Sequence, residues 1–357
     1  MKKRLRSEQE IMKNWKGNIN KPLVSICCIT YNHEKFIEDA LKGFLIQKTD
    51  FPFEILIHDD ASTDRTADII RQYEKKYPNL IKPIYQKENQ YSKGIRINPT
   101  FNFPRAKGRY LALCEGDDYW IEPNKLQIQI NEMEKYPEVD MSFHPAYEVI
   151  NGERGLVLAK HANRNKIFTL SEVIRGGGAF CPTASLIFRK EAVINLPEWF
   201  YKDAPVGDYF LQIFGARRGG ALFINKIMSV YRRGHANSYT AMQKKDKKLK
   251  KKIEMRIVAM NKLNDFLDGK YEAEIYDSLS LSCRSALSRQ DIQIEYRKKI
   301  YENYRDYFVL REKILWKFVF SKPLVYNIIK KLKDQIERIK RGVSVSKQKY
   351  IKTYNKS

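Results

Sequence analysis

The sequence predicts an α/β protein in which helices flank a mostly parallel β-sheet. Three observations support this fold class. Short apolar runs rich in β-branched residues alternate with segments whose apolar residues recur at helical spacing. The connections between these segments are short, as in strand–helix–strand units, which place parallel strands beneath helices on both faces. Polar clusters also follow several of the apolar runs directly.

The first part of the chain, up to about residue 135, contains four predicted strands. Their apolar runs cover residues 23–30, 53–58, 81–85 and 109–114. Apolar residues at helical spacing predict the intervening helices over about residues 36–45, 66–77, 98–107 and 123–133. Pro123 suits the first turn of the last of these helices, because its missing N–H is not needed there.

The pattern changes at about residue 139. Further strands are predicted over residues 139–144, 184–189, 221–224 and 227–232, with a helix over 208–216. After about residue 241 the chain becomes basic and helical in pattern. We therefore expect a basic lead-in, two halves of one α/β domain and a basic helical extension, over residues 1–21, 22–138, 139–240 and 241–357.

Composition narrows the class of protein. With 43% apolar residues and a mean hydropathy of −0.55, the 357-residue chain can bury a core, and it has no apolar run of about eighteen residues that would span a membrane. The N-terminus is charged and lacks the apolar stretch of a secretory signal. Five cysteines without a Cys-x-x-Cys pair indicate reduced thiols and a cytoplasmic protein.

The net charge of +24 is concentrated towards the C-terminus. Residues 242–357 hold 30 Lys and Arg against 14 Asp and Glu, about two thirds of the excess. A basic surface can bind nucleic acid, anionic lipid or phosphorylated substrates. No nucleic-acid-binding module is recognisable, so we do not expect nucleic acid as a partner. The aromatic and cationic segment 314–329 suits an interfacial helix on an anionic membrane surface, or else a helical subdomain packed on the core.

Polar clusters follow three of the predicted strands and would meet at one edge of the sheet. They are Thr30-Tyr31-Asn32, Asp59-Asp60 and Asp117-Asp118. In open α/β sheets, ligands bind beyond the carboxyl ends of the strands. Adjacent carboxylates are costly to bury unless a hard cation such as Mg2+ or Mn2+ shares the site with a phosphate. The alternative is a solvated turn, because Gly-Asp-Asp also favours turns.

Three motifs in order carry a family resemblance: PLVSICCITYNH at residues 22–33, IHDDASTD at 57–64 and EGDD at 115–118. Together they resemble the family 2 glycosyltransferases of the GT-A fold. The resemblance covers about residues 22–240. It implies inverting sugar transfer from a nucleotide-diphosphate donor, with UDP expected, to a glycan or lipid-linked glycan acceptor. Surface polysaccharide assembly at the inner face of the cell membrane is the implied setting.

The resemblance implies that residues 22–138 bind the nucleotide sugar. The candidate nucleotide-binding residues are Thr30, Tyr31, Asn32, Asp60, Lys93, Arg96 and Asp117. Tyr31 would stack on the nucleobase and Asp60 would accept the N3–H of uracil. Lys93 and Arg96 are candidate phosphate contacts. Core packing of Tyr31, helix capping near Asp60 and a solvated loop for the two cations are the structural alternatives.

A divalent cation, Mn2+ or Mg2+, is implied by the carboxylate pair. Asp118 resembles the direct metal ligand, and Asp117 would bind the ribose or reach the metal through water. The cation would neutralise the diphosphate, which is the leaving group. His235 is a second candidate ligand, in a stretch resembling Tyr-Arg-x-His, although Gly234 shifts it by one place. A surface histidine is its alternative.

The acceptor side is implied to lie in residues 139–240. Asp208, in VGDYFL, resembles the base that deprotonates the acceptor hydroxyl, although a carboxylate in a first helical turn can also serve as a cap. Trp120 and His144 are candidate acceptor contacts, and packing is the alternative for Trp120.

Two further classes of function remain open from the sequence. One is a retaining sugar transferase or nucleotidyltransferase on a related fold, and the other is a catalytically inactive glycan- or lipid-binding protein. The donor sugar, the acceptor linkage and the oligomeric state have no signature in the sequence.

Overall fold

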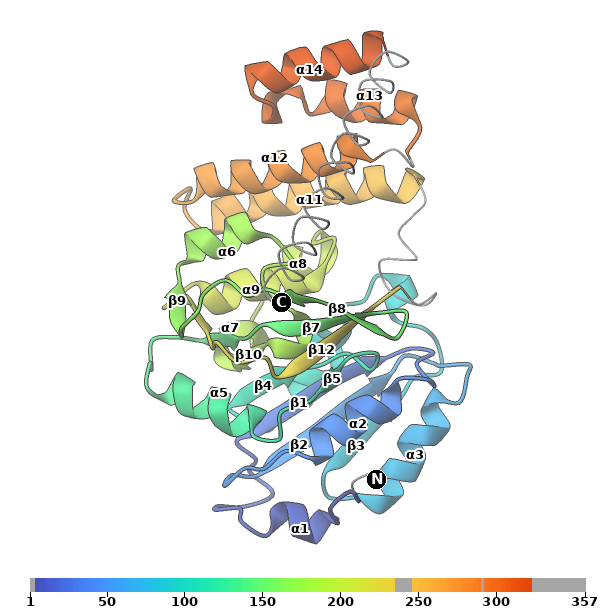
Figure 1. The fold of residues 1–357 in the computed structure, drawn as a ribbon, viewed down its shortest axis with the longest axis vertical. Helices are drawn as coiled ribbons and strands as arrows, with labels where there is room; N and C mark the ends of the chain where they lie inside the picture. Colours follow the sequence, from blue (N-terminus) through green and yellow to red (C-terminus); the bar gives the residue numbers. More distant parts are fainter. Residues whose placement is uncertain (1–3, 235–245, 290–291, 323–357) are drawn as a thin grey trace, which may run out of the picture. The chain divides into compact units, whose positions relative to one another are not determined.

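The computed structural model of the chain describes residues 4–234, 246–289 and 292–322 (Figure 1). It divides into two compact units, Met1–Leu279 and Ser280–Ser357. The predicted boundaries after residues 21, 138 and 240 are internal to the first unit and stay predictions.

An eight-stranded sheet forms the centre of the first unit, in the order β3-β2-β1-β4-β10-β6-β11-β9. The strands are β1 (Val24–Thr30), β2 (Phe53–Asp59), β3 (Ile81–Tyr85), β4 (Tyr110–Leu113), β6 (Met141–Phe143), β9 (Lys166–Phe168), β10 (Ile187–Arg189) and β11 (Ala221–Phe223). β3, β2, β1 and β4 are parallel, whereas β10 runs antiparallel to both β4 and β6. Nearly every residue of β1, β2 and β4 is buried, which explains their unbroken apolar runs. The predicted fold class is confirmed.

A smaller four-stranded sheet has the order β5-β12-β7-β8. Its strands are β5 (Tyr119–Trp120), β7 (Ala146–Ile150), β8 (Glu153–Leu158) and β12 (Ser229–Arg233). β12 is antiparallel to β5 and parallel to β7. The two residues of β5 follow Asp118 directly, so this sheet ties the Gly-Asp-Asp turn to a strand more than one hundred residues later.

Helices cover the large sheet. They are α1 (Glu8–Met12), α2 (Ile37–Leu45), α3 (Thr66–Lys76), α4 (Phe103–Arg105), α5 (Lys125–Glu134), α6 (Leu170–Gly176), α7 (Glu191–Ile194), α8 (Glu198–Lys202) and α9 (Gly207–Ala216), with single turns η1 (Tyr91–Lys93), η2 (Asn98–Asn102) and η3 (Thr183–Ser185). The predicted helix over 98–107 is instead a π-helical turn followed by the single turn α4. Pro104 lacks the N–H that would bond to Thr100, so a regular α-helix cannot continue through it.

The core lies between α2, the sheet and β5. The apolar face of α2 is buried as its spacing predicted. Gly43 in this helix is required by close packing, because a Cβ there would lie 2.8 Å from the backbone nitrogen of Trp120. All five cysteines are buried and none forms a disulfide bond, in agreement with the packing role predicted for Cys27, Cys28 and Cys114.

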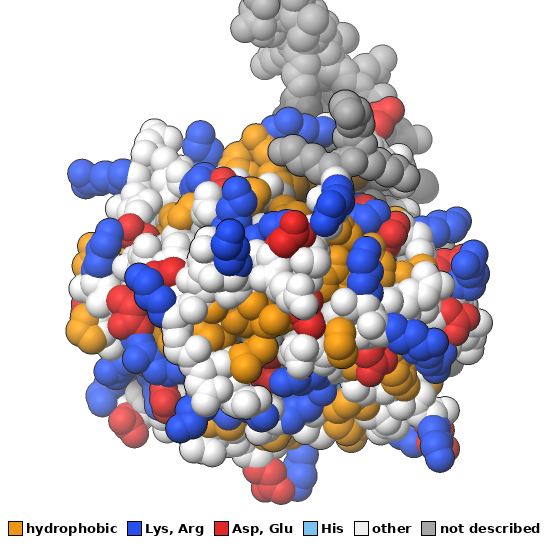
Figure 2. Space-filling model, turned by 90° about the horizontal axis from the view of Figure 1, so that it is seen from below, with side chains coloured by type: hydrophobic (Ala, Val, Ile, Leu, Met, Phe, Trp, Pro, Cys, Tyr) orange, Lys and Arg blue, Asp and Glu red, His pale blue; other side chains and the backbone are white. Residues whose placement is uncertain are grey.

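Within residues 246–289 and 292–322, the C-terminal extension is helical, as predicted. It contains α11 (Asp246–Phe266), α12 (Glu272–Ser288), α13 (Ile294–Asn303), η4 (Arg305–Tyr307) and α14 (Leu310–Ser321), and the border between the two units falls within α12. Among the residues that the structure describes, no helix is both long and apolar enough to cross a lipid bilayer. On the face shown in Figure 2, Lys and Arg side chains are spread among Asp and Glu side chains and do not form one patch.

Candidate active site

The three polar clusters lie side by side at the carboxyl edge of the large sheet. β1 and β2 pair in register, which places Thr30 beside Asp59. The Asp60 N–H donates to the Thr30 carbonyl at 2.9 Å, and the Gly116 N–H donates to the Ile29 carbonyl at the same distance. The convergence of the clusters that the topology predicted is therefore present in the structure.

The loop after β1 is joined to the loop after β2 by side-chain hydrogen bonds. Asn32 has a left-handed backbone (φ 54°), and its Oδ1 accepts the Thr63 N–H at 2.8 Å. The Asn32 N–H donates to Ser62 Oγ at 2.9 Å, and Asp59 accepts the Ser62 hydroxyl. Burial raises the pKa of Asp59. These contacts hold the loop that presents the half-buried Tyr31.

Asp60 anchors the loop after β3. Its side chain is buried, and its two carboxylate oxygens accept the backbone N–H groups of Gln90 and Tyr91 at 2.8 and 2.9 Å. His58 Nε2 lies 3.4 Å from Oδ1. Each carboxylate oxygen can accept two hydrogen bonds, so this arrangement leaves capacity for one more donor, such as the predicted base N–H.

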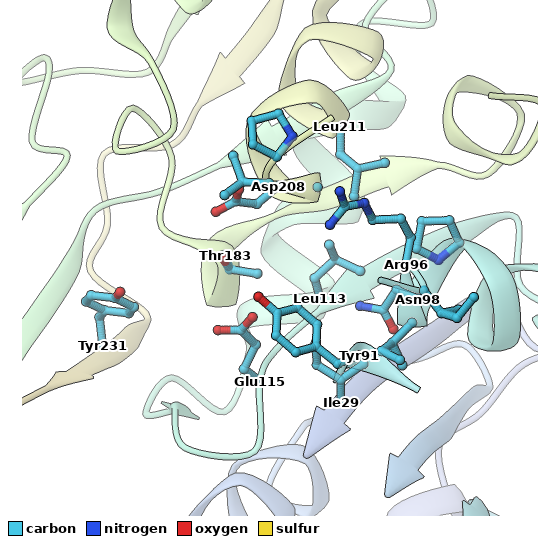
Figure 3. A pocket seen from close by; sticks show the side chains of 16 residues that line it. Ile29, Tyr91, Arg96, Asn98, Leu113, Glu115, Thr183, Asp208, Leu211 and Tyr231 are labelled. Atoms are coloured by element: carbon cyan, nitrogen blue, oxygen red, sulfur yellow. The ribbon is translucent and has the colours of Figure 1, made fainter. Parts of the chain in front are cut away.

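A cavity of about 200 Å³ lies between this loop, the ends of β1 and β4 and the N-terminus of α9 (Figure 3). Its walls include Ile29, Tyr91, Arg96, Asn98, Leu113, Glu115, Thr183, Asp208, Leu211 and Tyr231. Such a position at the carboxyl ends of parallel strands is where α/β sheets bind ligands. Of the predicted site residues, Arg96 and Asp208 line the cavity.

Asp208 lies in the first turn of α9, and its Oδ1 accepts the Tyr209 N–H at 2.8 Å. The positive end of the helix dipole lies next to this carboxylate. Figure 3 shows its carboxylate and that of Glu115 on the same side of the cavity. Arg96 approaches the same helix start, because a Cβ on Gly207 would lie 4.0 Å from Arg96 Cδ.

Glu115 is a cavity residue to which the sequence analysis gave no role. Burial raises its pKa to about 8, and the negative charges of Asp117 and Asp208 add to the effect. This half-buried environment favours the protonated form of the carboxyl group in the absence of a cation. The signal in the sequence for a role of Glu115 was its position immediately after the buried Cys114. The prediction used only the neighbouring pair Asp117 and Asp118.

Asp118, three residues after Glu115, is fully buried. Its Oδ1 accepts the Arg232 N–H at 2.8 Å, whereas its Oδ2 has no hydrogen-bond partner in the described residues. Burial and the charges of Asp117 and Glu115 raise the pKa of Asp118 far above its usual range. Asp117 is less buried, with its Oδ2 3.9 Å from His33 Nε2.

This carboxylate turn suits a divalent cation by its chemistry. Glu115, Asp117 and Asp118 supply hard oxygen donors, Asp118 has an unsatisfied buried oxygen, and a cation would relieve their mutual repulsion. Within the described ranges, however, no three His, Cys, Asp or Glu side chains are grouped closely enough to hold a metal ion. The metal role of Asp118 stays a prediction, and His235 lies outside the described residues.

Arg232, on β12, contacts the turn formed by Glu115, Asp117 and Asp118 through its side chain as well as its N–H. Its Nη1 donates to the Asp117 carbonyl at 2.8 Å, and its Nη2 forms an ion pair with Asp39 of α2 at 2.5 Å. The guanidinium carbon lies 4.2 Å from the centre of the Tyr119 ring. Arg232 was not among the predicted site residues; in this stretch only His235 was.

The remaining predicted residues lie away from the cavity walls. Lys93 is half exposed and forms an ion pair with Glu88. Trp120 is buried with its Nε1–H donating to the Ala184 carbonyl at 2.8 Å, and this favours the packing alternative. His144 is also buried, and its Nδ1 lies 2.9 Å from the Pro145 carbonyl oxygen. Their acceptor roles stay predictions.

Comparison with known proteins places this geometry in a family. The model of glycosyl transferase family 2 matches residues 25–196. The putative teichuronic acid biosynthesis glycosyltransferase TuaG of Bacillus subtilis is 31% identical over 186 residues, which cover 52% of this chain and 68% of TuaG. The chain belongs to glycosyl transferase family 2.

Other curated relatives match this chain over smaller shares of their own length. An uncharacterized protein of Mycobacterium tuberculosis, Rv1520, is 36% identical over 219 residues, covering 60% of this chain and 59% of that protein. The chain thus spans about three fifths of the length of its first curated relatives. The Escherichia coli protein WfgD, a UDP-Glc:alpha-D-GlcNAc-diphosphoundecaprenol beta-1,3-glucosyltransferase, is 32% identical over 165 residues, 46% of this chain and 60% of WfgD.

The structure of Staphylococcus aureus TarS, residues 1–349, solved in complex with UDP-GlcNAc, has a similar fold. The TM-score is 0.51 at 16% identity, covering 84% of this chain and 90% of TarS. This likeness confirms the predicted GT-A fold. By their names, TuaG belongs to teichuronic acid biosynthesis and WfgD acts on a diphosphoundecaprenol-linked sugar.

Proposed function

We propose that this protein is a metal-dependent inverting glycosyltransferase that moves a sugar from a UDP-sugar to a glycan or lipid-linked glycan. The observation that carries the proposal is the cavity in which Asp208, at the start of α9, lies with Glu115 beyond the ends of β1 and β4. Membership of family 2 supports the transferase class. WfgD, named for a UDP-Glc donor and a diphosphoundecaprenol-linked acceptor, supports the donor and the acceptor class.

The chain's own residues would bind and orient the donor. Asp60, held by two backbone N–H groups, would accept the base N3–H, with Tyr31 stacked on the base. Thr30 and Asn32 would shape the floor and loop beneath it, and Arg96 would contact the diphosphate from the cavity wall.

Asp118 and Asp117 would hold Mn2+ or Mg2+, with His235 as a further candidate ligand and Lys93 as a further phosphate contact. When bound, the cation supplies charge neutralisation to the departing nucleotide diphosphate. Trp120 and His144 would shape the acceptor side through the residues that they support.

Asp208 would act as the general base. Its carboxylate takes the proton of the acceptor hydroxyl while the hydroxyl oxygen bonds to the anomeric carbon of the sugar. The bond between that carbon and the diphosphate oxygen breaks, and the nucleotide diphosphate leaves with the electron pair. Attack from the opposite face inverts the configuration, so an α-linked donor gives a β-linked product. We place this reaction in the cytoplasm, at the inner face of the cell membrane.

A donor panel with and without Mn2+ tests the proposal. We expect one nucleotide sugar to be transferred or hydrolysed only with the metal, and NMR of the product to show inverted configuration. Asp208→Asn should lower kcat by about 10²–10⁴-fold. Asp68→Asn is the matched control, because Asp68 occupies the first turn of α3 outside the cavity. No turnover or binding of any nucleotide sugar, or full activity of D208N, would contradict the proposal.

A further inference from the structure

The last helix of the described chain, α14, exposes a row of large apolar side chains. Leu310, Ile314 and Phe318 follow one another at intervals of four residues, which places them on one face of the helix. They are 74%, 63% and 38% exposed, and the neighbouring Leu315 is 45% exposed. We call these four residues the outer face of α14.

The outer face is not needed to hold the helix in place. Trp316 and Val319, on the opposite side, are buried. Trp316 stacks on Phe320, whose ring also meets Tyr301 of α13. Packing therefore uses one side of α14, and the apolar residues on the other side remain in contact with solvent at a cost in free energy.

The exposed charged side chains of α14 itself have one sign. Arg311, Lys317 and Lys322 are exposed on α14 or at its end. Glu312, the one acidic residue of α14, is paired with Arg284 at 2.7 Å and so is withdrawn from this surface. An apolar strip with cationic flanks matches an anionic lipid surface, where apolar side chains enter the interface and cations meet lipid phosphates.

We propose that the outer face of α14 docks on an anionic phospholipid surface. A second copy of this chain fits less well, because a symmetric contact would bring together two strips that both have cationic flanks. Residues 323–357 fit less well for the same reason, since they hold ten Lys and Arg against two Asp and Glu. The outer face differs from the surface expected from the sequence, because Trp316 packs inward.

Binding of the full-length protein to vesicles tests this surface without any sugar donor, so the outcome does not depend on the proposed activity. The vesicles are pure phosphatidylcholine, or phosphatidylcholine with about one third phosphatidylglycerol. We expect sedimentation with the anionic vesicles only, weakened by salt. Ile314→Ser with Phe318→Ser should lower the partition coefficient about 30-fold or more, and Arg311→Gln with Lys317→Gln about 30-fold.

Two matched controls separate the outer face from general surface effects. Val258→Ser removes an apolar side chain that is 44% exposed on α11, and Lys13→Gln with Lys75→Gln removes two charges at exposed positions of the first unit. Both should bind vesicles like the wild type. Melting temperatures equal to that of the wild type show that the α14 variants are folded.

Three results would overturn the proposal. They are no binding of the wild type to anionic vesicles, wild-type binding by both α14 variants, and a concentration-dependent dimer in sedimentation that I314S/F318S abolishes. The second result would move the lipid contact to other basic residues, and the third would make the outer face an interface between copies.

Discussion

The side chain of Lys125, on α5, is the basis of a stability prediction that can be worked out in full. It is completely buried, and its Nζ has no hydrogen-bond partner among the described residues. Nζ lies 4.0 Å from the centre of the Trp120 ring. Burial lowers its pKa from 10.5 to about 7. A charged amine in this position therefore lowers the free energy of unfolding.

The size and pH dependence of the cost follow from these two pKa values. In the unfolded chain the amine is protonated up to about pH 10.5, whereas in the folded protein it is neutral above about pH 7. Between about pH 7 and pH 10.5 the unfolded state binds more protons than the folded state, so this group makes the protein more stable as the pH rises. Below about pH 7 the full cost is present, about 4–5 kcal/mol. The Trp120 ring favours the ammonium by about 2 kcal/mol, which leaves about 2–3 kcal/mol.

Lys125→Met removes the charge and keeps an unbranched side chain of similar length. We expect its free energy of unfolding at about pH 7 to exceed that of the wild type by about 2–3 kcal/mol, with the difference shrinking towards zero at about pH 10. Guanidinium denaturation followed by tryptophan fluorescence at both pH values measures this. Lys75→Met, on the exposed side of α3, should show no such pH-dependent gain. A K125M protein that is less stable than the wild type, or a gain independent of pH, would refute the reasoning.

Three further predictions concern the carboxylate turn. Gly116→Ala should lower the free energy of unfolding by about 1–3 kcal/mol, as measured by denaturation, because its Cβ would lie 2.6 Å from Thr30 Oγ1. Asp118→Asn should raise the melting temperature in the absence of metal. Asn keeps the acceptor for the Arg232 N–H, but it removes the free-energy cost of burying a carboxyl group that ionises on unfolding. Calorimetry of the same variant should show weaker Mn2+-dependent binding of UDP. Arg232→Lys should lose either the hydrogen bond to the Asp117 carbonyl or the ion pair with Asp39, and the affinity for UDP should fall about tenfold. A variant that binds UDP with the affinity of the wild type would exclude a positioning role for Arg232.

The sequence predicted the elements whose signal is local. β1, β2 and β4 were predicted because strands buried on both faces have unbroken apolar runs. β5 and β8 were not predicted, because β5 has two residues and β8 is almost fully exposed, so neither has a pattern of its own. Lys125 shows the same limit, since nothing in the α5 sequence distinguishes a buried lysine from an exposed one.

The candidate site divides in the same way. The three polar clusters were found because each follows a predicted strand, and the topology of a parallel sheet brings strand ends together. Arg232 was missed because its contacts with the carboxylate turn depend on the pairing of β12 with β5. Its N–H donates to Asp118, which lies 114 residues earlier in the chain. Glu115 was missed because its raised pKa arises from burial and from the charges of Asp117 and Asp208, which come together only in the folded protein.

The carboxylate turn is unfavourable for folding, and this is an argument for its function. Asp118 is buried and Glu115 is half-buried, and the negative charge of Asp117 adds to the rise in the pKa of both carboxyl groups. A turn that served only to reverse the chain could use Asn or Ser at these positions without repulsion. The contacts of Arg232 to this turn offset part of the cost by using a second sheet to hold the carboxylates together. Acidic groups that raise one another's pKa are expected where a cation and a diphosphate complete the site, as in the proposed function, because binding would then relieve their electrostatic repulsion.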